Sequence, residues 1–562
     1  MSKKPEGLEN LPACVVEYIT VVAKRVGNTL QVRREVFQEL TDHFSDALRD
    51  CAGEDERQAA GERAIEQFGD AKMLGSLIRR GKKRCRPLWK MAMIRSAQCF
   101  LVLIVVFCVY TWWFMAGEPT IRVNYVAKLN QLTQPSVPTE ENAWKNYKRV
   151  TELYVEPSPE IERLLEQVSM SKFVVEKLAD LSPSERIFLE KWIKDNQPAW
   201  EEFIVGSRKR YCWVQYSSLQ EGDESILTMT IPPLYGLRQM GKQGIWRARI
   251  AMEKRQIQRT MEDCLTVVRV GKHWQRPAST LIEQLVGMGI SSVGHNEILR
   301  IVSSAKITAH ELVNTQKQLQ RIYIEGYPLM DLGFERLDFL DNVQHCFTEG
   351  GLGGGRLIPE RLVEGVPFGQ IEPEILLGAM FGDGRDKTVA KGLEYYTKIE
   401  ELVKLSPYEQ RTREVNNWSD NYVANLSEIK SPFLKMLLPS FLLAGELAYR
   451  SKALHEATLT VLALRRWRLD KGRYPATLDV LVSGGYLKAI PEDPYSDGAL
   501  KYERRGDDFV LYSVSSDFRD DGGVQVKGRR APWDTTFGDR VFWPVNPPLL
   551  TEEEARRRGD VD

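Results

Sequence analysis

Hydrophobic residues are concentrated in one long run in the first quarter of the chain. The 22 residues of the range 96–117 carry no charge, and every residue of Phe100–Phe107 is apolar. As an α-helix, such a run is about 33 Å long, which is enough to cross a bilayer core of about 30 Å. A helix in a protein core usually keeps a polar face over this length. The pattern therefore predicts a transmembrane helix over 96–117, with a buried core helix as the alternative.

The charges that flank this run are unequal. Basic residues cluster before it, whereas Glu118 follows it and the next base is Arg122. The positive-inside rule then places the N-terminus in the cytoplasm and the C-terminal region outside. Because the run begins so far along the chain, a permanent anchor is expected rather than a cleaved secretory signal. The basic residues predicted to set topology and to contact anionic lipid are Arg79, Arg80, Lys82, Lys83, Arg84, Arg86, Lys90 and Arg95.

The segment before the apolar run has helical periodicity. Apolar residues recur every three or four positions from Val32 to Cys51, which predicts an amphipathic helix from Thr29 onward. A second helix is predicted to end at Gly69, and Asp70 is predicted to cap a third. Helices this short are stable only when their apolar faces pack together.

Three motifs in this segment carry a resemblance. They are Val32-Arg33-Arg34-Glu35-Val36, Glu39-Leu40-x-x-His43-x-x-Asp46 and Ala64-x-x-x-Phe68-Gly69-Asp70. Together they resemble the bacterial HAAS or permease-prefix helical domain, over roughly residues 12–80. The resemblance implies a cytoplasmic protein-interaction module that precedes membrane spans, without catalysis. His43 is interpreted as a helix-face residue rather than a metal ligand.

The range 118–447 is predicted to be mainly helical, with breaks at prolines. Apolar residues have helical spacing in 161–168, 174–181 and 246–261. Ser182-Pro183-Ser184-Glu185 and Ser406-Pro407-Tyr408-Glu409 each place Ser at a helix cap, Pro just inside it and Glu at the third position. No strict repeat is present, so an irregular bundle or solenoid is expected.

Common catalytic motifs are absent from the sequence, including G-x-S-x-G, H-E-x-x-H and the phosphate-binding loop. The glycine-rich range 350–356 could present backbone N–H groups to an anion, but no strand of a nucleotide fold is predicted before it, which favours a loop. His345 and Cys346 are adjacent and would point about 100° apart on a helix. The protein is therefore predicted not to be an enzyme; the alternative is an unrecognised site in the helical middle, in a pocket near Arg356 or His310.

The period of the pattern changes near the C-terminus. Helical spacing over 454–469 is predicted to end at Gly472. Two strands are predicted at 499–503 and 509–514, joined by a hairpin turn at 505–507. The predicted fold class is thus mainly α with one transmembrane helix and a small α+β C-terminal module, a helix plus an antiparallel hairpin. The aromatic residues of the tail are expected to pack against this module.

Six short motifs follow one another in this module: Gly472-Arg473-Tyr474-Pro475, Leu478-x-x-Leu481, Pro491-x-Asp493-Pro494, Leu500-x-Tyr502, Tyr512-Ser513 and Ser516-Asp517. Their order resembles the C-terminal part of type II secretion major pseudopilins. In that family the loop after the last paired strand binds calcium, so the resemblance implies Asp517, Asp520 and Asp521 as Ca²⁺ ligands. Closely spaced carboxylates can supply the six to eight oxygens that Ca²⁺ prefers. A solvated acidic turn is the alternative.

Two features separate the chain from a pseudopilin itself. The hydrophobic helix lies more than 300 residues before the module, and no prepilin-peptidase site precedes residue 96. A borrowed module is therefore predicted rather than a filament subunit.

Composition excludes some classes of function. The 77 basic and 77 acidic residues balance, with a pI near 7.0, so no overall charge favours nucleic acid. Eight cysteines in 562 residues exclude a small disulfide-stapled scaffold, and the absence of a C-x-x-C pair argues against a thiol-redox or zinc-knuckle site. Cys212, Cys264 and Cys346 are the cysteines expected outside the cytoplasm, and they allow at most one disulfide bond.

The sequence thus predicts a single-pass protein of the bacterial inner membrane with a binding, scaffolding or signalling role. Its predicted parts are a cytoplasmic helical interaction domain (1–90), the transmembrane helix (96–117), an extracytoplasmic helical region (118–447), the pseudopilin-like module (448–530) and a C-terminal tail (531–562). The expected partners are the bilayer and a protein that binds the cytoplasmic domain, with no nucleic acid. Ca²⁺ is the one cofactor considered. An accessory of a type II secretion system that docks with pseudopilins is the alternative function.

Overall fold

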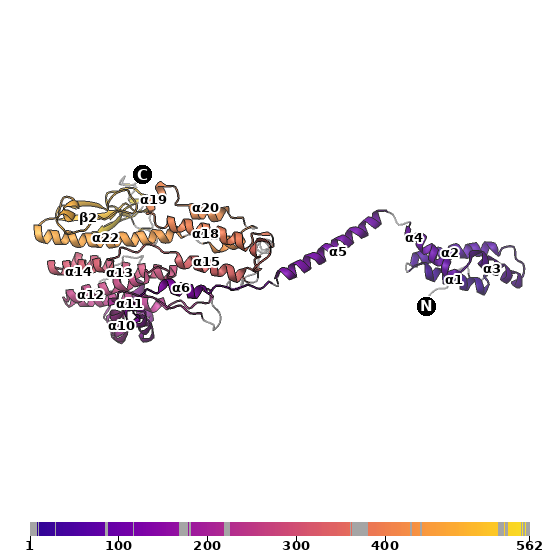
Figure 1. Ribbon diagram of the computed structural model, residues 1–562, viewed down its shortest axis with the longest axis horizontal. Coiled ribbons are helices and arrows are strands. Elements are labelled where there is room, and N and C mark those ends of the chain that lie inside the picture. Colours follow the sequence, from indigo (N-terminus) through magenta and orange to yellow (C-terminus); the bar gives the residue numbers. More distant parts are fainter. Residues whose placement is uncertain are drawn as a thin grey trace. The chain divides into compact units, whose positions relative to one another are not determined.

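The computed structural model is mainly helical, with a small sheet near the C-terminus (Figure 1). It divides into two compact units, residues 1–113 and 114–562, which we call the head unit and the body. The structure describes residues 8, 10–27, 30–84, 88–115, 117–167, 178, 181–218, 225–359, 361, 380–427, 430–438, 441–526, 533, 538–551, 553–554 and 557.

The head unit begins with four short helices. They are α1 (Ala13–Val26), α2 (Leu30–Ala47), α3 (Glu54–Phe68) and α4 (Ala71–Arg84). The periodicity analysis predicted the last three but not α1, which packs against all of them. Val15, Ile19 and Val22 of α1 are fully buried in the core of this unit. The unpredicted helix is therefore the one around which the others assemble.

The motifs that carry the first resemblance have structural roles in these helices. Gly69, with a φ of 77°, ends α3, and its carbonyl accepts a hydrogen bond of 2.9 Å from the Tyr18 hydroxyl. Asp70 caps α4 as predicted, because its carboxylate accepts from the Met73 N–H at 2.8 Å. The ring of His43 packs edge-on against Phe68 at 5.2 Å. This contact supports the interpretation of His43 as a helix-face residue.

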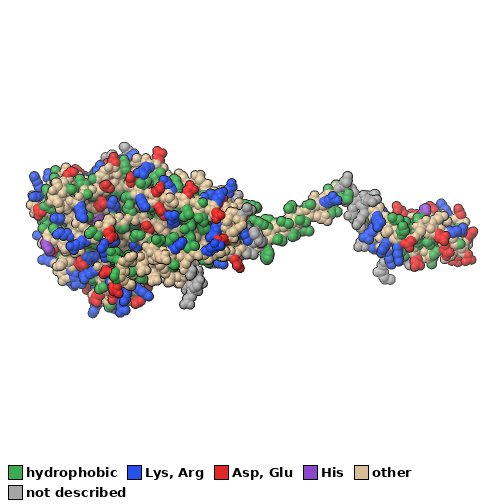
Figure 2. All heavy atoms as spheres, viewed as in Figure 1, with side chains coloured by type: hydrophobic (Ala, Val, Ile, Leu, Met, Phe, Trp, Pro, Cys, Tyr) green, Lys and Arg blue, Asp and Glu red, His purple; other side chains and the backbone are tan. Residues whose placement is uncertain are grey.

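One helix of the head unit is long and uncovered. Helix α5 (Leu88–Met115) includes an apolar window, Met91–Tyr110, of mean hydropathy 2.3. None of this window is buried within the structure, and hydrophobic side chains follow the helix on the face shown in Figure 2. A typical core helix is mostly buried, whereas this window is not covered by the described residues. Among the described residues, α5 is the single helix long and apolar enough to cross a membrane.

The body consists mostly of α-helices. In chain order they are α6 (Tyr125–Thr133), α7 (Trp144–Leu153), α8 (Pro159–Gln167), α9 (Pro183–Asp195), α10 (Gln197–Arg208), α11 (Leu234–Glu253), α12 (Ile257–Trp274), α13 (Leu281–Ser304), α14 (Ala309–Ile322), α15 (Gly333–Cys346), α18 (Arg385–Leu402), α19 (Pro407–Thr412), α20 (Trp418–Asn425), α21 (Pro432–Leu437) and α22 (Leu442–Lys471). Short 3₁₀ turns η1 (Thr139–Glu141) and η3 (Leu352–Gly354) lie between them. Helix α22 packs along α13 and α14, which in turn pack on α12 (Figure 1).

Local signals for helix starts were accurate in the body, whereas one periodic stretch was misread. Ser182 and Ser406 both form the predicted capping boxes. The range 246–261 is not one helix, because α11 ends at Glu253 and the chain reverses through Arg255, whose φ is 56°. The apolar spacing continues across this turn although Trp246 and Ile250 pack in one hydrophobic cluster and Ile257 and Met261 pack in another. The predicted helix over 174–181 lies largely outside the described residues.

Helices α12 and α13 approach each other closely at two glycines. A Cβ atom added to Gly271 would lie 2.4 Å from the backbone nitrogen of Ser291, and one added to Gly287 would lie 2.6 Å from the carbonyl oxygen of Gly271. Any side chain at these positions would push the helices apart. The close approach of α12 and α13 therefore depends on residues with no side chain.

The C-terminal module contains the predicted hairpin and one strand more. Helix α22 ends at Gly472 with a φ of 76°, and the short helix α23 (Asp479–Ser483) follows. Strands β1 (Lys501–Arg505) and β2 (Asp508–Ser513) pair as an antiparallel hairpin. The tail supplies β4 (Arg540–Trp543), which pairs antiparallel with β2 and gives the order β1-β2-β4. Strands β3 (Gln525–Val526) and β5 (Leu549–Leu550) form a separate parallel pair.

The module and the helical region share one hydrophobic core. Leu265 of α12, Ile298 of α13, Val461 of α22 and Leu511 of β2 belong to a single cluster of buried side chains. Moreover, the predicted boundary at residue 448 falls inside α22. Removing residues 448–530 would expose this core, so a deletion cannot separate a docking role of the module from simple unfolding of the body.

Candidate functional site

The predicted Ca²⁺ ligands lie in the segment Asp517–Gly523, which we call the acidic loop. It follows the 3₁₀ turn η4 (Ser515–Asp517) after β2. One carboxylate oxygen of Asp517 accepts a hydrogen bond from the Gly538 N–H at 3.0 Å, and one of Asp521 accepts from the same N–H at 2.9 Å. Two of the three predicted ligands therefore converge on one backbone amide.

The third predicted ligand points elsewhere. Asp520 accepts a hydrogen bond of 2.8 Å from the Tyr512 hydroxyl and lies 3.3 Å from the Lys501 ammonium group. Burial alone would raise the pKa of Asp520, but the Tyr512 hydroxyl, a backbone N–H and Lys501 hold it below its usual value. Asp520 is thus paired with a cation of the protein on β1.

A fourth carboxylate, which sequence analysis missed, joins the first two. Asp539 is 1% exposed and accepts from the N–H groups of Gly523 at 2.7 Å and Asp521 at 3.4 Å. Burial raises the pKa of Asp539 to about 8, and burial together with the charge of Asp521 raises the pKa of Asp517 to about 6. Asp539 lies 18 residues beyond Asp521 in the chain, so no local spacing pointed to it.

The acidic loop uses these carboxylates to bind its own backbone. The oxygen atoms of Asp517, Asp521 and Asp539 are of the type that Ca²⁺ prefers, but each carboxylate already accepts a backbone N–H. Among the described residues, no three His, Cys, Asp or Glu side chains are grouped so that they could hold a metal ion. The Ca²⁺ site therefore stays a prediction.

The motif residue Asp493 organises the sheet. Its carboxylate accepts hydrogen bonds from the Ser513 hydroxyl (2.6 Å), the Val514 N–H (2.9 Å) and the Tyr495 N–H (3.0 Å). The side chain is only 2% exposed. Asp493 therefore fixes the end of β2, from which the acidic loop departs.

The predicted topology cluster is partly described. Arg79, Arg80 and Lys82 are exposed on α4, and Lys82 forms an ion pair of 2.9 Å with Glu35. Arg95 is exposed on α5. The side chains of Lys83, Arg84, Arg86 and Lys90 lie outside the described part of the structure.

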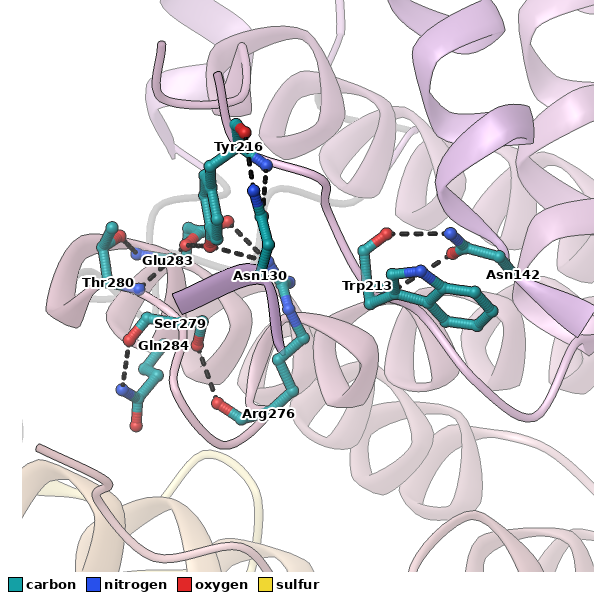
Figure 3. A network of polar contacts seen from close by, with 9 residues as sticks. All are labelled: Asn130, Asn142, Trp213, Tyr216, Arg276, Ser279, Thr280, Glu283 and Gln284. Atoms are coloured by element: carbon teal, nitrogen blue, oxygen red, sulfur yellow. Dashed lines mark hydrogen bonds and ion pairs between the residues drawn. The ribbon is translucent and has the colours of Figure 1, made fainter. Parts of the chain in front are cut away.

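A buried polar network joins several chain segments of the body (Figure 3). Arg276 and Glu283 form an ion pair of 2.8 Å, and the Tyr216 hydroxyl donates to Glu283 at 2.6 Å. The Thr280 N–H also donates to Glu283, at the start of α13, while Asn130 exchanges two hydrogen bonds with the backbone of Tyr216. Glu283 is completely buried. This network ties the N-terminus of α13 to two distant chain segments, which is a structural role.

The remaining candidates of the helical region are also structural in character. A Cβ atom on Gly354 would lie 2.2 Å from the Asp386 carboxylate, and the Gly355 carbonyl accepts from the Arg385 N–H. The glycine-rich loop therefore packs on the start of α18 beside a negative charge, which disfavours an anion there. Cys346 is buried, and His345 lies 3.5 Å from an oxygen of Asp341.

No family model matches the chain, and no curated protein and no solved structure is significantly similar to it. The two resemblances therefore rest on the motifs alone.

Proposed function

We propose that the protein is a single-pass membrane-anchored envelope protein with a binding, scaffolding or signalling role. The observation that carries this proposal is α5, whose apolar window has no protein cover. Leu103 is 65% exposed and Val106 is 58% exposed. In water such a surface would be an unusually large uncovered apolar patch, whereas a bilayer would cover it completely.

The energetics favour insertion of α5. Between Phe100 and Val109 the helix carries nine Phe, Leu, Ile or Val residues. At about −0.3 to −0.6 kcal/mol each on a membrane-insertion scale, these contribute roughly −3 to −5 kcal/mol. One arginine at the helix centre costs about 2.5 to 3.5 kcal/mol, so two would reverse the balance.

The head unit also shows a feature that suits a protein partner. Met73 and Leu77, one turn apart on α4, are 63% and 51% exposed. Residues four positions apart lie on the same helix face, so the two side chains form a small apolar surface. With the basic residues of α4 and α5 on the cytoplasmic side, this surface would be available to a cytoplasmic protein.

The anchor is tested by a double substitution, Leu103→Arg with Val106→Arg. The matched control is Leu132→Arg with Leu443→Arg in the body, whose side chains are 62% and 61% exposed. We expect the α5 variant to leave the membrane fraction and the control to remain resistant to carbonate extraction. Equal behaviour of the two variants would contradict the proposal.

Orientation is tested with an impermeant maleimide on spheroplasts. Cys212, Cys264 and Cys346 are buried, so the body gives little background labelling. A cysteine introduced at exposed Ser303 in the body should react in intact spheroplasts. One introduced at exposed Ala59 on α3 should react only after lysis. The reverse pattern would refute the cytoplasmic placement of the head unit.

A further inference from the structure

The body contains a cleft of about 350 Å³ with an unusual concentration of cations. Its lining residues come from the C-terminal parts of α10, α12 and α14 and from the segments that follow them, and α12 packs against both of the other helices. We call it the basic cleft. Its cationic lining residues are Arg208, Lys209, Arg210, Arg269, Lys272 and Arg321.

Acidic residues neutralise only part of this charge. Glu262 pairs with Arg269 at 2.9 Å and lies 3.7 Å from Arg208. Glu325 pairs with Arg210 at 2.6 Å. These two carboxylates therefore pair directly with three of the six cations, and Glu325 also attracts Lys272 without contact.

Two of the remaining cations have no close partner. Within the described residues, the side chains of Lys272 and Arg321 form no hydrogen bond and no ion pair, although Glu325 acts on Lys272 from a longer distance. Burial lowers the pKa of Lys272, and Glu325 partly opposes this effect. An ammonium group that is partly removed from water without a partner is costly, so an anion would stabilise it.

The floor of the cleft is held rigidly. The ring of His273 donates to the Lys209 carbonyl at 3.0 Å through Nε2, and its Nδ1 accepts from the Tyr147 hydroxyl at 2.6 Å. Burial lowers the pKa of His273 to about 3, so the ring is neutral. It therefore positions the chain at Lys209 without adding charge.

The dipoles of the helices neutralise part of the positive charge of the cleft but not all of it. Cations are favourable at helix C-termini, each of which carries roughly half a negative charge. Three helix ends and two carboxylates together supply roughly 3.5 negative charges, against six positive ones. The surplus of more than two positive charges remains for a ligand.

We propose that the basic cleft binds a small organic phosphate, with the phosphate between Lys272 and Arg321 and the organic part against Ile322 and Ile324. These two side chains give the cleft an apolar wall, and Ile324 is 70% exposed. A guanidinium group binds phosphate oxygens with two parallel hydrogen bonds, and an ammonium group binds them as a point charge. This inference concerns the body alone and does not depend on the membrane anchor.

The test measures binding to the purified full-length protein in detergent. The probes are inorganic pyrophosphate, glycerol 3-phosphate and phosphatidic acid in mixed micelles, each compared with sodium chloride at equal ionic strength. The last two probes distinguish a free phosphate ester from a lipid headgroup. We expect glycerol 3-phosphate to bind and to raise the melting temperature of the protein by several degrees. Binding of pyrophosphate alone would contradict the apolar contact, and binding of phosphatidic acid alone would contradict a free phosphate ester.

The variants locate the site. Lys272→Gln and Arg321→Gln should each weaken binding about tenfold or more, because each removes a charge-assisted contact. Arg321→Lys should bind with an affinity between those of the wild type and Arg321→Gln, because it keeps the charge but loses the second parallel hydrogen bond. The control Lys306→Gln removes an exposed lysine in the turn between α13 and α14 and should change nothing. Absence of binding by all three probes, or unchanged affinity in both Gln variants, would overturn the proposal.

Discussion

The acidic loop and the basic cleft are both dense clusters of charge in the body, but they use charge in opposite ways. In the acidic loop, Asp517 and Asp521 accept hydrogen bonds from the backbone N–H of Gly538. In the basic cleft, Lys272 and Arg321 form no hydrogen bond or ion pair with the described residues. The carboxylates of the acidic loop are thus directed at their own chain, whereas these two cations of the basic cleft are not.

This difference shows why the density of charge is a poor guide to a binding site. A carboxylate that accepts backbone N–H groups stabilises a loop conformation, and such groups are expected wherever a turn must be fixed. A partly buried cation without a partner has no such structural task. The position of the hydrogen-bond partners therefore distinguishes the two clusters better than the number of charged residues.

The largest expected effect is the loss of stability on removing the carboxylate of Asp493, which fixes the end of β2 before the acidic loop. Asp493→Ala would leave three donors, at Ser513, Val514 and Tyr495, without their acceptor. At about 1–3 kcal/mol for each unsatisfied buried group, we expect the C-terminal module to lose roughly 3–5 kcal/mol. Thermal unfolding and hydrogen exchange of the Val514 amide measure this loss. Asp497→Ala, at an exposed position in the same turn, should cost less than about 0.5 kcal/mol.

Calcium binding would remove the difference between the two clusters, because the acidic loop would then also be a ligand site. If Ca²⁺ binds there, a concentration of about 100 times the Kd should stabilise the protein by about 2.7 kcal/mol relative to EDTA. Thermal melts of the full-length protein measure the shift. Asp517→Ala should abolish it, whereas Asp520→Asn should not, since Asp520 is paired with Lys501. Protons compete at Asp517, whose pKa is about 6, so the shift should be larger at pH 8 than at pH 5. No shift at pH 8 would leave the loop with its structural role alone.

The pH dependence of stability tests the role of Asp539 beside the acidic loop. The pKa of Asp539 is about 8 in the folded protein, well above the usual value. A carboxyl group whose pKa is higher in the folded than in the unfolded protein stabilises the fold when the pH is below the unfolded pKa. This contribution is lost as the pH rises through the folded pKa. We therefore expect the module to lose roughly 1–3 kcal/mol between pH 5 and pH 9.

The variant Asp539→Asn isolates this effect, because an amide oxygen can still accept from Gly523 but does not titrate. Other buried groups also titrate in the wild-type protein. Burial lowers the pKa of His295 to about 4. The stability that comes from its neutral ring is therefore lost in the opposite direction, as the pH falls. The difference between wild type and Asp539→Asn cancels these contributions. A difference that stays constant from pH 5 to pH 9 would contradict the assignment to Asp539.

Sequence patterns predicted helices and strands more accurately than they predicted contacts between distant parts of the chain. Capping motifs located the starts of α9 and α19, and the Gly472 stop and the β1–β2 hairpin were also found, because these signals are local. Helix α1 was missed although Val15, Ile19 and Val22 have helical spacing. Strand β4 could not be predicted, because Arg540–Trp543 is short and becomes a strand only by pairing with β2.

The two charge clusters show the same limit for sites. Asp517 and Asp521 were predicted, with Asp520, from the resemblance to the pseudopilin calcium loop, whereas Asp539 reaches them only through the fold. Arg208–Arg210 is a visible basic run, but Lys272 and Arg321 join it from α12 and α14. Helix packing decides these long-range neighbours, and a single sequence contains no direct signal for it.

The smallest expected effect is the stability change on removing a cation from the basic cleft. Arg321→Gln breaks no hydrogen bond or ion pair among the described residues and reduces repulsion from neighbouring cations. We therefore expect a change within about 0.5 kcal/mol, and a slightly stabilised protein at low salt, where repulsion is least screened. Thermal melts at two salt concentrations measure this change, and Asp493→Ala serves as the reference for a large loss of stability. A loss of several kcal/mol would mean that the cleft, like the acidic loop, uses its charges to hold its own fold.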